Sequence, residues 1–107
     1  MKRKIKFVVQ AGTWFDKVNG NTYHASRITR TSDGAMLHVP FQYGYGNMFH
    51  QTALEAMAKA KWLPKEYRGE SVNGSGLYWG YERENNYPIE WICTPMLKRD
   101  VVELGRE

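Results

Sequence analysis

Residues 21–63 constrain the fold of this chain most strongly, because they carry the signals of two strands and a helix in one short run. Leu37, Val39 and Phe41 occupy every second position, the period that is typical of a strand with one buried face. The pair Asp33-Gly34 before them is a common tight turn between antiparallel strands. This run predicts a β-hairpin followed by a helix, and therefore a fold of the α+β class.

The helix is predicted over residues 48–63, where the helical pattern is the clearest in the chain. Phe49 and Met57 fall on one helical face together with several alanines, which allow a helix to lie close to a sheet. Asn47 is suited to cap the first turn, and Pro64 is suited to end the helix. We expect this helix to be the principal one.

The first strand is predicted over residues 5–9, where apolar side chains alternate with lysines. A two-residue turn at Asp33-Gly34 would pair Ile28 with Val39. If the first strand joins the same sheet, this register sorts the side chains into two faces. The inward face then holds Ile28, Leu37, Val39 and Phe41, and the outward face holds Lys4, Lys6, Arg27, Thr29 and His38, with Arg3 and Arg30 at its margins.

A second hairpin is predicted in the C-terminal half. Residues 77–81 and 89–93 both alternate, and the polar run 84–86 between them suggests a turn. Cys93 alternates in phase with Ile89 and is expected to be a small buried residue. The whole chain, residues 1–107, is thus predicted to form a single α+β domain, an antiparallel β-sheet of about five strands packed against one principal α-helix.

Residues 95–107 leave two alternatives open. Pro95 and Gly105 suit the two ends of a short helix, whereas Val101-Val102 suits a strand. The patterns do not decide between these structures.

Length and composition exclude several classes of protein. A chain of 107 residues suits one domain, and its content of 42% hydrophobic and 14% aromatic residues differs from that of disordered chains. No apolar run approaches the roughly 20 residues that cross a bilayer, so no membrane association is expected. A lone cysteine cannot form an intramolecular disulfide, which is compatible with a reducing cytosol. We therefore expect a cytoplasmic protein.

Positive charge is concentrated in the N-terminal part of the chain. The net charge is +4, but residues 1–31 carry seven basic residues and one acidic residue, a net +6. The remainder carries eight basic and ten acidic residues, a net −2. Such asymmetry indicates either an anionic partner or simply a need for solubility.

No catalytic or metal-binding motif is found in the sequence. The three histidines lie on separate predicted elements without the spacing of a zinc site. Gly44-Tyr45-Gly46 before the helix could approach an anion, but it lacks the third glycine of a dinucleotide fingerprint and the lysine of a P-loop, so a tight turn explains it better. We expect no catalytic residue, no metal, no cofactor and no enzymatic activity.

Aromatic and basic residues are the candidate binding groups. Tyrosines that flank glycines provide large rigid contact area, although packing at the edge of the core explains them equally well. A basic sheet face attracts phosphates through counterion release, and the nearby ring of Tyr23 or Trp14 could stack on bases. The candidate binding residues are Trp14, Tyr43, Tyr45, Lys4, Lys6, Arg27 and His38.

Several short motifs resemble those of small uncharacterised bacteriophage accessory proteins. The motifs lie within residues 14–63 and are Trp14-Phe15-Asp16-Lys17, Gly20-Asn21-Thr22-Tyr23, Pro40-Phe41-Gln42-Tyr43-Gly44-Tyr45-Gly46 and Thr52-Ala53-Leu54-Glu55. The resemblance implies a setting in the host bacterial cytosol and stoichiometric binding of a host protein or protein–nucleic acid complex, as in inhibitors of host defence such as anti-CRISPR proteins. The alternative is a nucleic-acid-binding protein that uses a basic β-sheet face. The oligomeric state, monomer or homodimer, is left open.

Overall fold

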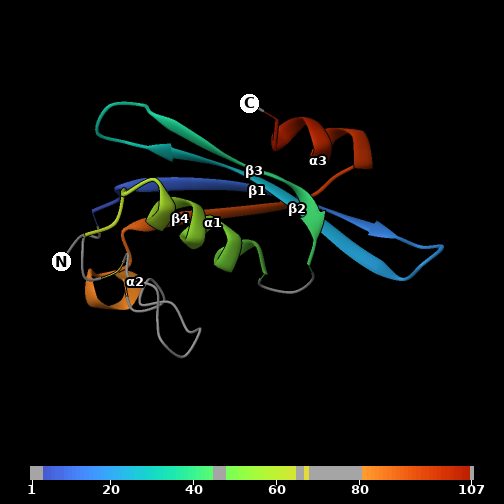
Figure 1. Ribbon diagram of the computed structural model, residues 1–107, viewed down its shortest axis with the longest axis horizontal. Coiled ribbons are helices and arrows are strands. Elements are labelled where there is room, and N and C mark those ends of the chain that lie inside the picture. Colours follow the sequence, from blue (N-terminus) through green and yellow to red (C-terminus); the bar gives the residue numbers. More distant parts are fainter. Residues whose placement is uncertain (1–3, 45–47, 65–66, 68–80, 107) are drawn as a thin grey trace.

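The computed structural model describes residues 4–44, 48–64, 67 and 81–106. These residues form a sheet with helices on both of its faces (Figure 1). The elements in chain order are β1 (Phe7–Asp16), β2 (Asn21–Arg30), β3 (Met36–Tyr43), α1 (Met48–Lys59), α2 (Tyr81–Glu84), β4 (Ile89–Pro95) and α3 (Lys98–Leu104). Within the described residues, no helix is long and apolar enough to cross a bilayer.

The sheet is mixed, with the strand order β3-β2-β1-β4. β1 pairs antiparallel with β2, and β2 with β3, whereas β4 runs parallel to β1. The α+β class and the single principal helix are confirmed, but the described residues form four strands and not about five. The prediction of a second hairpin is wrong at Tyr81–Glu84, which forms a short helix. Residues 77–80, the rest of its first predicted strand, lie outside the described residues.

One face of the sheet is covered by α1 and forms the main core. Val9, Ile28 and Met57 are completely buried there, so the alternation in the first predicted strand is confirmed. Lys6 is exposed, as predicted. The core cluster of this face consists of Phe7, Val9, Ile28, Val39, Ala53, Leu54, Met57, Leu63, Tyr81 and Ile89.

The turn between β2 and β3 is longer than predicted. Ile28 pairs with Leu37 and not with Val39, because the Arg30 N–H donates to the Ala35 carbonyl across a four-residue loop. The Arg30 guanidinium also donates to the Asp33 carboxylate, which stabilises this loop. The register differs from the prediction by two residues, and a shift of two keeps each side chain on its predicted face.

A β-bulge near the end of β3 changes the face of one predicted core residue. The register of β2 with β3 shifts between Ser26, which pairs with Val39, and His24, which pairs with Gln42. Phe41 consequently lies on the face opposite α1, where its ring stacks on Tyr23. The prediction that Phe41 points inward is wrong, because the extra residue of a bulge reverses the alternation.

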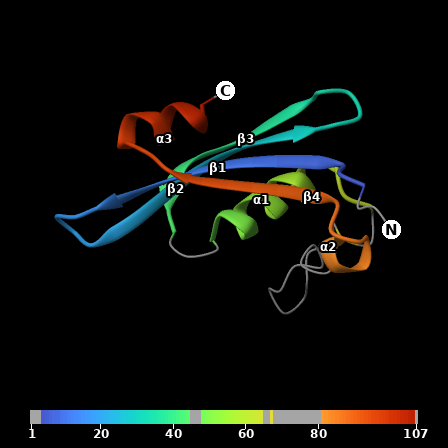
Figure 2. The same cartoon turned by 180° about the vertical axis from the view of Figure 1, so that it is seen from behind.

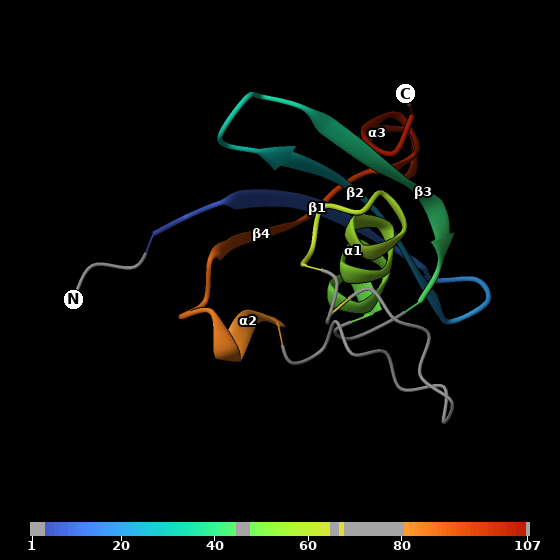
Figure 3. The same cartoon turned by 60° about the vertical axis from the view of Figure 1, so that its left-hand side comes forward.

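The outer face, opposite α1, is partly covered by α3. The last residues are helical, which decides between the two alternatives for this segment, and α3 contacts β1, β2 and β3 (Figures 1 and 3). A Cβ added to Gly12 would meet Leu104 at 3.2 Å, and one added to Gly105 would meet Ala25 at 2.9 Å. Small residues on both sides therefore let the helix lie against the strands. The face on which the sequence placed Arg27 and His38 is therefore partly covered by a helix.

His24 joins β2 to the start of α1. The side chain is buried, with only 1% of its surface exposed. Its Nδ1–H donates to the Gly44 carbonyl at 3.2 Å, and its Nε2 is hydrogen-bonded to the Thr52 hydroxyl at 3.0 Å. Because a carbonyl only accepts, the bond to Gly44 places a proton on Nδ1. Burial disfavours the charged ring and lowers the pKa of His24, so the folded protein favours the neutral form.

Acidification should lower the free energy of unfolding once the pH falls below the ordinary histidine pKa of 6.5. Burial lowers the pKa of His24, and the hydrogen bond to Gly44 opposes this only in part. The unfolded chain then binds a proton that the folded protein does not bind, so stability is lost as the pH falls. Denaturant unfolding between about pH 7 and pH 5, where few carboxylates titrate, measures the slope.

In the same experiment, the free energy of unfolding of the His24→Gln variant should depend less on pH than that of the wild type. Burial also lowers the pKa of His50, so the double variant with His50→Gln should reduce the slope further. If the free energy of unfolding fell equally with pH in the wild type and both variants, the buried histidines would not be the cause of the pH dependence.

Candidate functional site

Four aromatic side chains gather on the outer face beside the start of α3. We call Trp14, Tyr23, Phe41 and Tyr43 the aromatic cluster. The ring centroids of Tyr23 and Phe41 are 5.1 Å apart and nearly parallel, and those of Trp14 and Tyr23 are 5.8 Å apart. Tyr43 packs edge-on against Tyr23 at 5.9 Å and leaves 54% of its surface exposed. Three adjacent strands thus present a continuous aromatic surface.

Strand register brings these rings together. Trp14 is the direct partner of Tyr23 in β1 and β2, and Tyr23 is the partner of Tyr43 in β2 and β3. Directly opposed aromatic residues on one face are favourable cross-strand pairs. The bulge in β3 then places Phe41 on the same face. The cluster is therefore held by backbone pairing and needs no rearrangement to form.

The hairpin that carries the cluster ends in an ordered loop. The Asp16 carboxylate accepts hydrogen bonds from the backbone N–H groups of Val18 and Asn19 and from the Asn19 side chain. The hydrogen bond from the Asn19 side chain is the main reason that the pKa of Asp16 lies below its usual value. Gly20 takes the positive φ of 68° that closes the turn. These contacts stabilise the loop that connects β1 to β2 (Figure 2).

Positive charge borders the aromatic cluster. The Lys98 ammonium at the start of α3 lies 5.4 Å from the centre of the Trp14 ring, within the range of a cation–π contact. Arg27 and His38 are direct partners farther along the outer face. The buried Nε of Arg27 has no hydrogen-bond partner. Lys98 is therefore the cation beside the rings, whereas Arg27 lies beyond Ala25, against which Gly105 packs.

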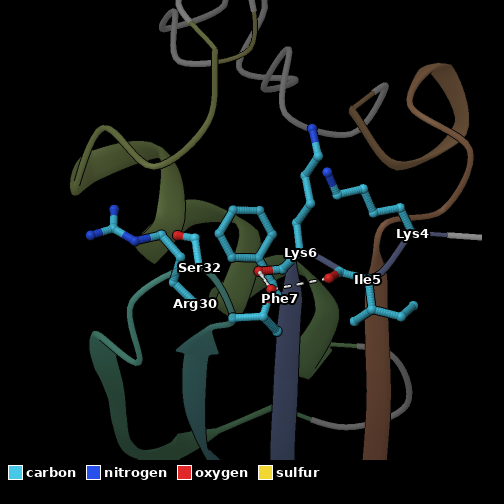
Figure 4. A pocket seen from close by; sticks show the side chains of 7 residues that line it. Lys4, Ile5, Lys6, Phe7, Arg30 and Ser32 are labelled. Atoms are coloured by element: carbon cyan, nitrogen blue, oxygen red, sulfur yellow. Dashed lines mark hydrogen bonds between the residues drawn. The ribbon is translucent and has the colours of Figure 1, made fainter.

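Lys4 and Lys6 lie at the opposite end of the sheet from the aromatic cluster. They line a pocket of about 380 Å³ together with Ile5, Phe7, Arg30, Thr31 and Ser32 (Figure 4). Lys4 and Lys6 extend past the strand end, and the Thr31 hydroxyl donates to the Ile5 and Lys6 carbonyls. The ring of Phe7 provides an apolar floor. This pocket is separate from the aromatic cluster.

The structure brings together only some of the predicted binding residues. Trp14 and Tyr43 belong to the aromatic cluster, whereas Tyr45 lies outside the described residues. Arg27 and His38 are neighbours on the outer face. Lys4 and Lys6 lie together at the far end of β1.

Two predicted placements are wrong. Arg30 was expected at the margin of the outer face, but it lies on the side of α1, with its guanidinium 4.7 Å from the centre of the Trp62 ring. Cys93 was expected to be buried and is exposed at the edge of the sheet. Partial burial nevertheless raises the pKa of its thiol.

The sequence analysis missed two members of the site, Phe41 and Lys98. Tyr23 was considered there as a stacking ring, and a four-residue loop over residues 17–20 pairs it directly with Trp14. Phe41 could not be predicted as a member, because only the bulge turns it outward. Lys98 depends on how α3 returns to the sheet.

Neither a metal site nor a known relative indicates the function, so the functional argument rests on the geometry of the site. Across the described residues, no group of three or more His, Cys, Asp or Glu side chains could hold a metal ion. No protein-family model, no curated protein and no solved structure matches the chain.

Proposed function

We propose that this protein acts by stoichiometric binding, with the aromatic cluster as its contact surface. The observation that carries the proposal is the set of four rings held on three adjacent strands, with Tyr43 more than half exposed. Aromatic residues on a rigid support provide most of the binding energy in many interfaces, because little entropy is lost when they are covered. The cluster has the composition of such a contact.

The proposed partner is a host protein or protein–nucleic acid complex in a phage-infected bacterium. This setting rests on the motif resemblance, and it includes inhibition of a host defence complex. Lys98 beside the rings, with Arg27 farther along the same face, favours a partner with an acidic surface, because complementary charge accelerates association. No catalytic step is part of this proposal.

Direct nucleic-acid binding is the second candidate. It is favoured by the location of Arg27 and His38 on the same face as the rings, since bases stack on aromatic side chains while cations contact phosphates. The two candidates differ in salt dependence. Affinity for a nucleic acid should fall steeply as salt is added, because each phosphate contact releases counterions.

The variant Tyr43→Ala should weaken partner binding at least about tenfold, as expected for an exposed aromatic anchor. The measurement captures partners from a bacterial lysate on the immobilised protein, with and without nuclease, and then titrates the purified partner. Tyr87→Ala is a matched control, because Tyr87 is 50% exposed and lies outside the cluster.

Equal affinity of Tyr43→Ala and wild type would contradict the proposed contact surface. Loss of all captured material after nuclease treatment, together with a steep salt dependence, would favour direct nucleic-acid binding instead. A partner that survives nuclease and binds more weakly only to the cluster variant supports stoichiometric protein binding.

A further inference from the structure

β4 forms an exposed edge of the sheet. It pairs with β1 on one side and is the last strand in the order β3-β2-β1-β4. Ile92 in its centre keeps 43% of its surface exposed, and Cys93 beside it is exposed. Proteins commonly protect such edges with lysines, internal prolines or bulges, because unpaired strand edges attract other strands. β4 contains one charged residue, Glu90, and its proline is the last residue of the strand.

The backbone of β4 alternates between its neighbour and the open side. The Lys6 N–H donates to the Pro88 carbonyl, and the Met96 N–H donates to the Thr13 carbonyl. Even-numbered residues of this strand therefore point their backbone groups toward β1, and the odd-numbered residues Trp91 and Cys93 point theirs outward. In the described part of the chain, no backbone group of another element bonds to these two residues.

The opposite edge of the sheet is less suited to pairing. β3 contains Pro40, which lacks an N–H group, and the bulge near this residue interrupts the regular ladder. Pairing of β4 with β3 of another copy would be head-to-tail, and would add copies until a ring closed or an open fibre grew. Pairing of β4 with β4 closes after two copies.

We propose that two copies of this chain pair through β4 in antiparallel orientation and form one continuous eight-stranded sheet. Residues that point outward must face each other, so Trp91 of one copy pairs with Cys93 of the other and Ile92 faces its own counterpart across the two-fold axis. This register overlaps the full strand. It also covers the exposed Ile92 and places each Glu90 opposite a threonine, Thr94, so that no like charges are opposed.

The two-fold axis runs perpendicular to the sheet in this arrangement. The outer faces of both copies therefore lie on the same side of the dimer, and each carries its own aromatic cluster. The dimer would present two equivalent contact surfaces. The inference concerns the β4 edge alone and does not depend on what the aromatic cluster binds.

Disulfide formation tests both the pairing and its register. In a Cys93→Ser background, Ile92→Cys should oxidise to a covalent dimer, because opposed residues at the centre have Cα atoms about 4.5 Å apart. Thr94→Cys in the same background is the matched control. Its two copies would be separated by four residues along the strand, about 14 Å, and should stay uncrosslinked. Failure at position 92, or crosslinking at position 94 instead, would overturn the proposal.

The mass in solution provides the second test, because it needs no cysteine. Sedimentation or light scattering of the wild type should give twice the chain mass of 12.5 kDa. Ile92→Lys should raise the dimer dissociation constant at least about tenfold, since two ammonium groups would meet at the axis. Leu97→Lys introduces the same charge at another exposed apolar residue and should leave the dimer intact.

Circular dichroism should show that both variants keep the folded structure. A monomeric wild type at every concentration tested, or an Ile92→Lys protein as dimeric as wild type, would contradict pairing through β4.

Discussion

Replacing Met57 by aspartate should unfold the protein. Met57 has no exposed surface and lies in the core between α1 and the sheet. Removal of a buried side chain of this size costs about 2 to 5 kcal/mol, and burial of an unpaired carboxylate adds several more. Domains of this size have a total stability of only about 5 to 15 kcal/mol. Circular dichroism and denaturant unfolding should therefore show no cooperative transition for Met57→Asp.

Lys59→Asp is the control on the same helix. Lys59 is exposed in the last turn of α1, so this variant introduces the same residue without burying it. It should cost about 1 kcal/mol or less through the helix dipole. A cooperative transition for Met57→Asp close to that of Lys59→Asp would contradict the assignment of this face as the core.

Replacing Gly105 by valine should separate α3 from the outer face and strongly destabilise the protein. A Cβ at this position would lie 2.5 Å from the Val39 carbonyl oxygen and 3.0 Å from the Pro40 Cα, and both are backbone atoms that cannot move aside. The φ of Gly105 is −87°, so the expected effect comes from this close approach and not from backbone strain. Overpacking of this kind costs about 1 to 3 kcal/mol, and undocking of α3 adds the loss of the Val101 contacts.

Hydrogen exchange of the α3 amides, measured alongside denaturant unfolding, should show faster exchange in Gly105→Val. Gly20→Ala serves for comparison, because Gly20 has a positive φ of 68° and open space around its Cα. That variant should cost about 1 kcal/mol and leave α3 protected. Unchanged α3 protection in Gly105→Val would show that the helix does not rest on the strands as described.

Periodicity along the chain predicted the main core correctly. Phe7, Val9 and Met57 are buried because each lies on the apolar face of an amphipathic element, and this property is local to the sequence. The error in the turn at Gly34 left the faces unchanged, since the register shifted by two residues. Local patterns are sufficient for these features.

Features that depend on distant segments could not be predicted from the sequence. The parallel pairing of β4 with β1 depends on the route of the chain through α1, and alternation is the same in parallel and antiparallel strands. The cover that α3 provides depends on small residues, Gly12, Ala25 and Gly105, that meet only after folding. The small size of these residues does not indicate, in the sequence, which segment packs against which.

Only part of the candidate site could be predicted, because its other members come together through contacts between distant segments. Trp14 and Tyr43 were predicted as candidate binding residues, but the pairing of both with Tyr23 follows from the strand register. Phe41 follows from a bulge that turns one residue to the other face. The aromatic cluster is therefore a property of the folded sheet, and the sequence shows only some of its members.

The most direct test of the outer-face aromatic cluster is a nuclear Overhauser measurement on the ring protons of Phe41. The structure predicts contacts with the ring of Tyr23, whose centroid is 5.1 Å away, and with that of Trp14 at 6.4 Å. Contacts between Phe41 and the Met57 methyl group would instead place Phe41 in the core beneath α1. That result would contradict the bulge and the binding surface that depends on it.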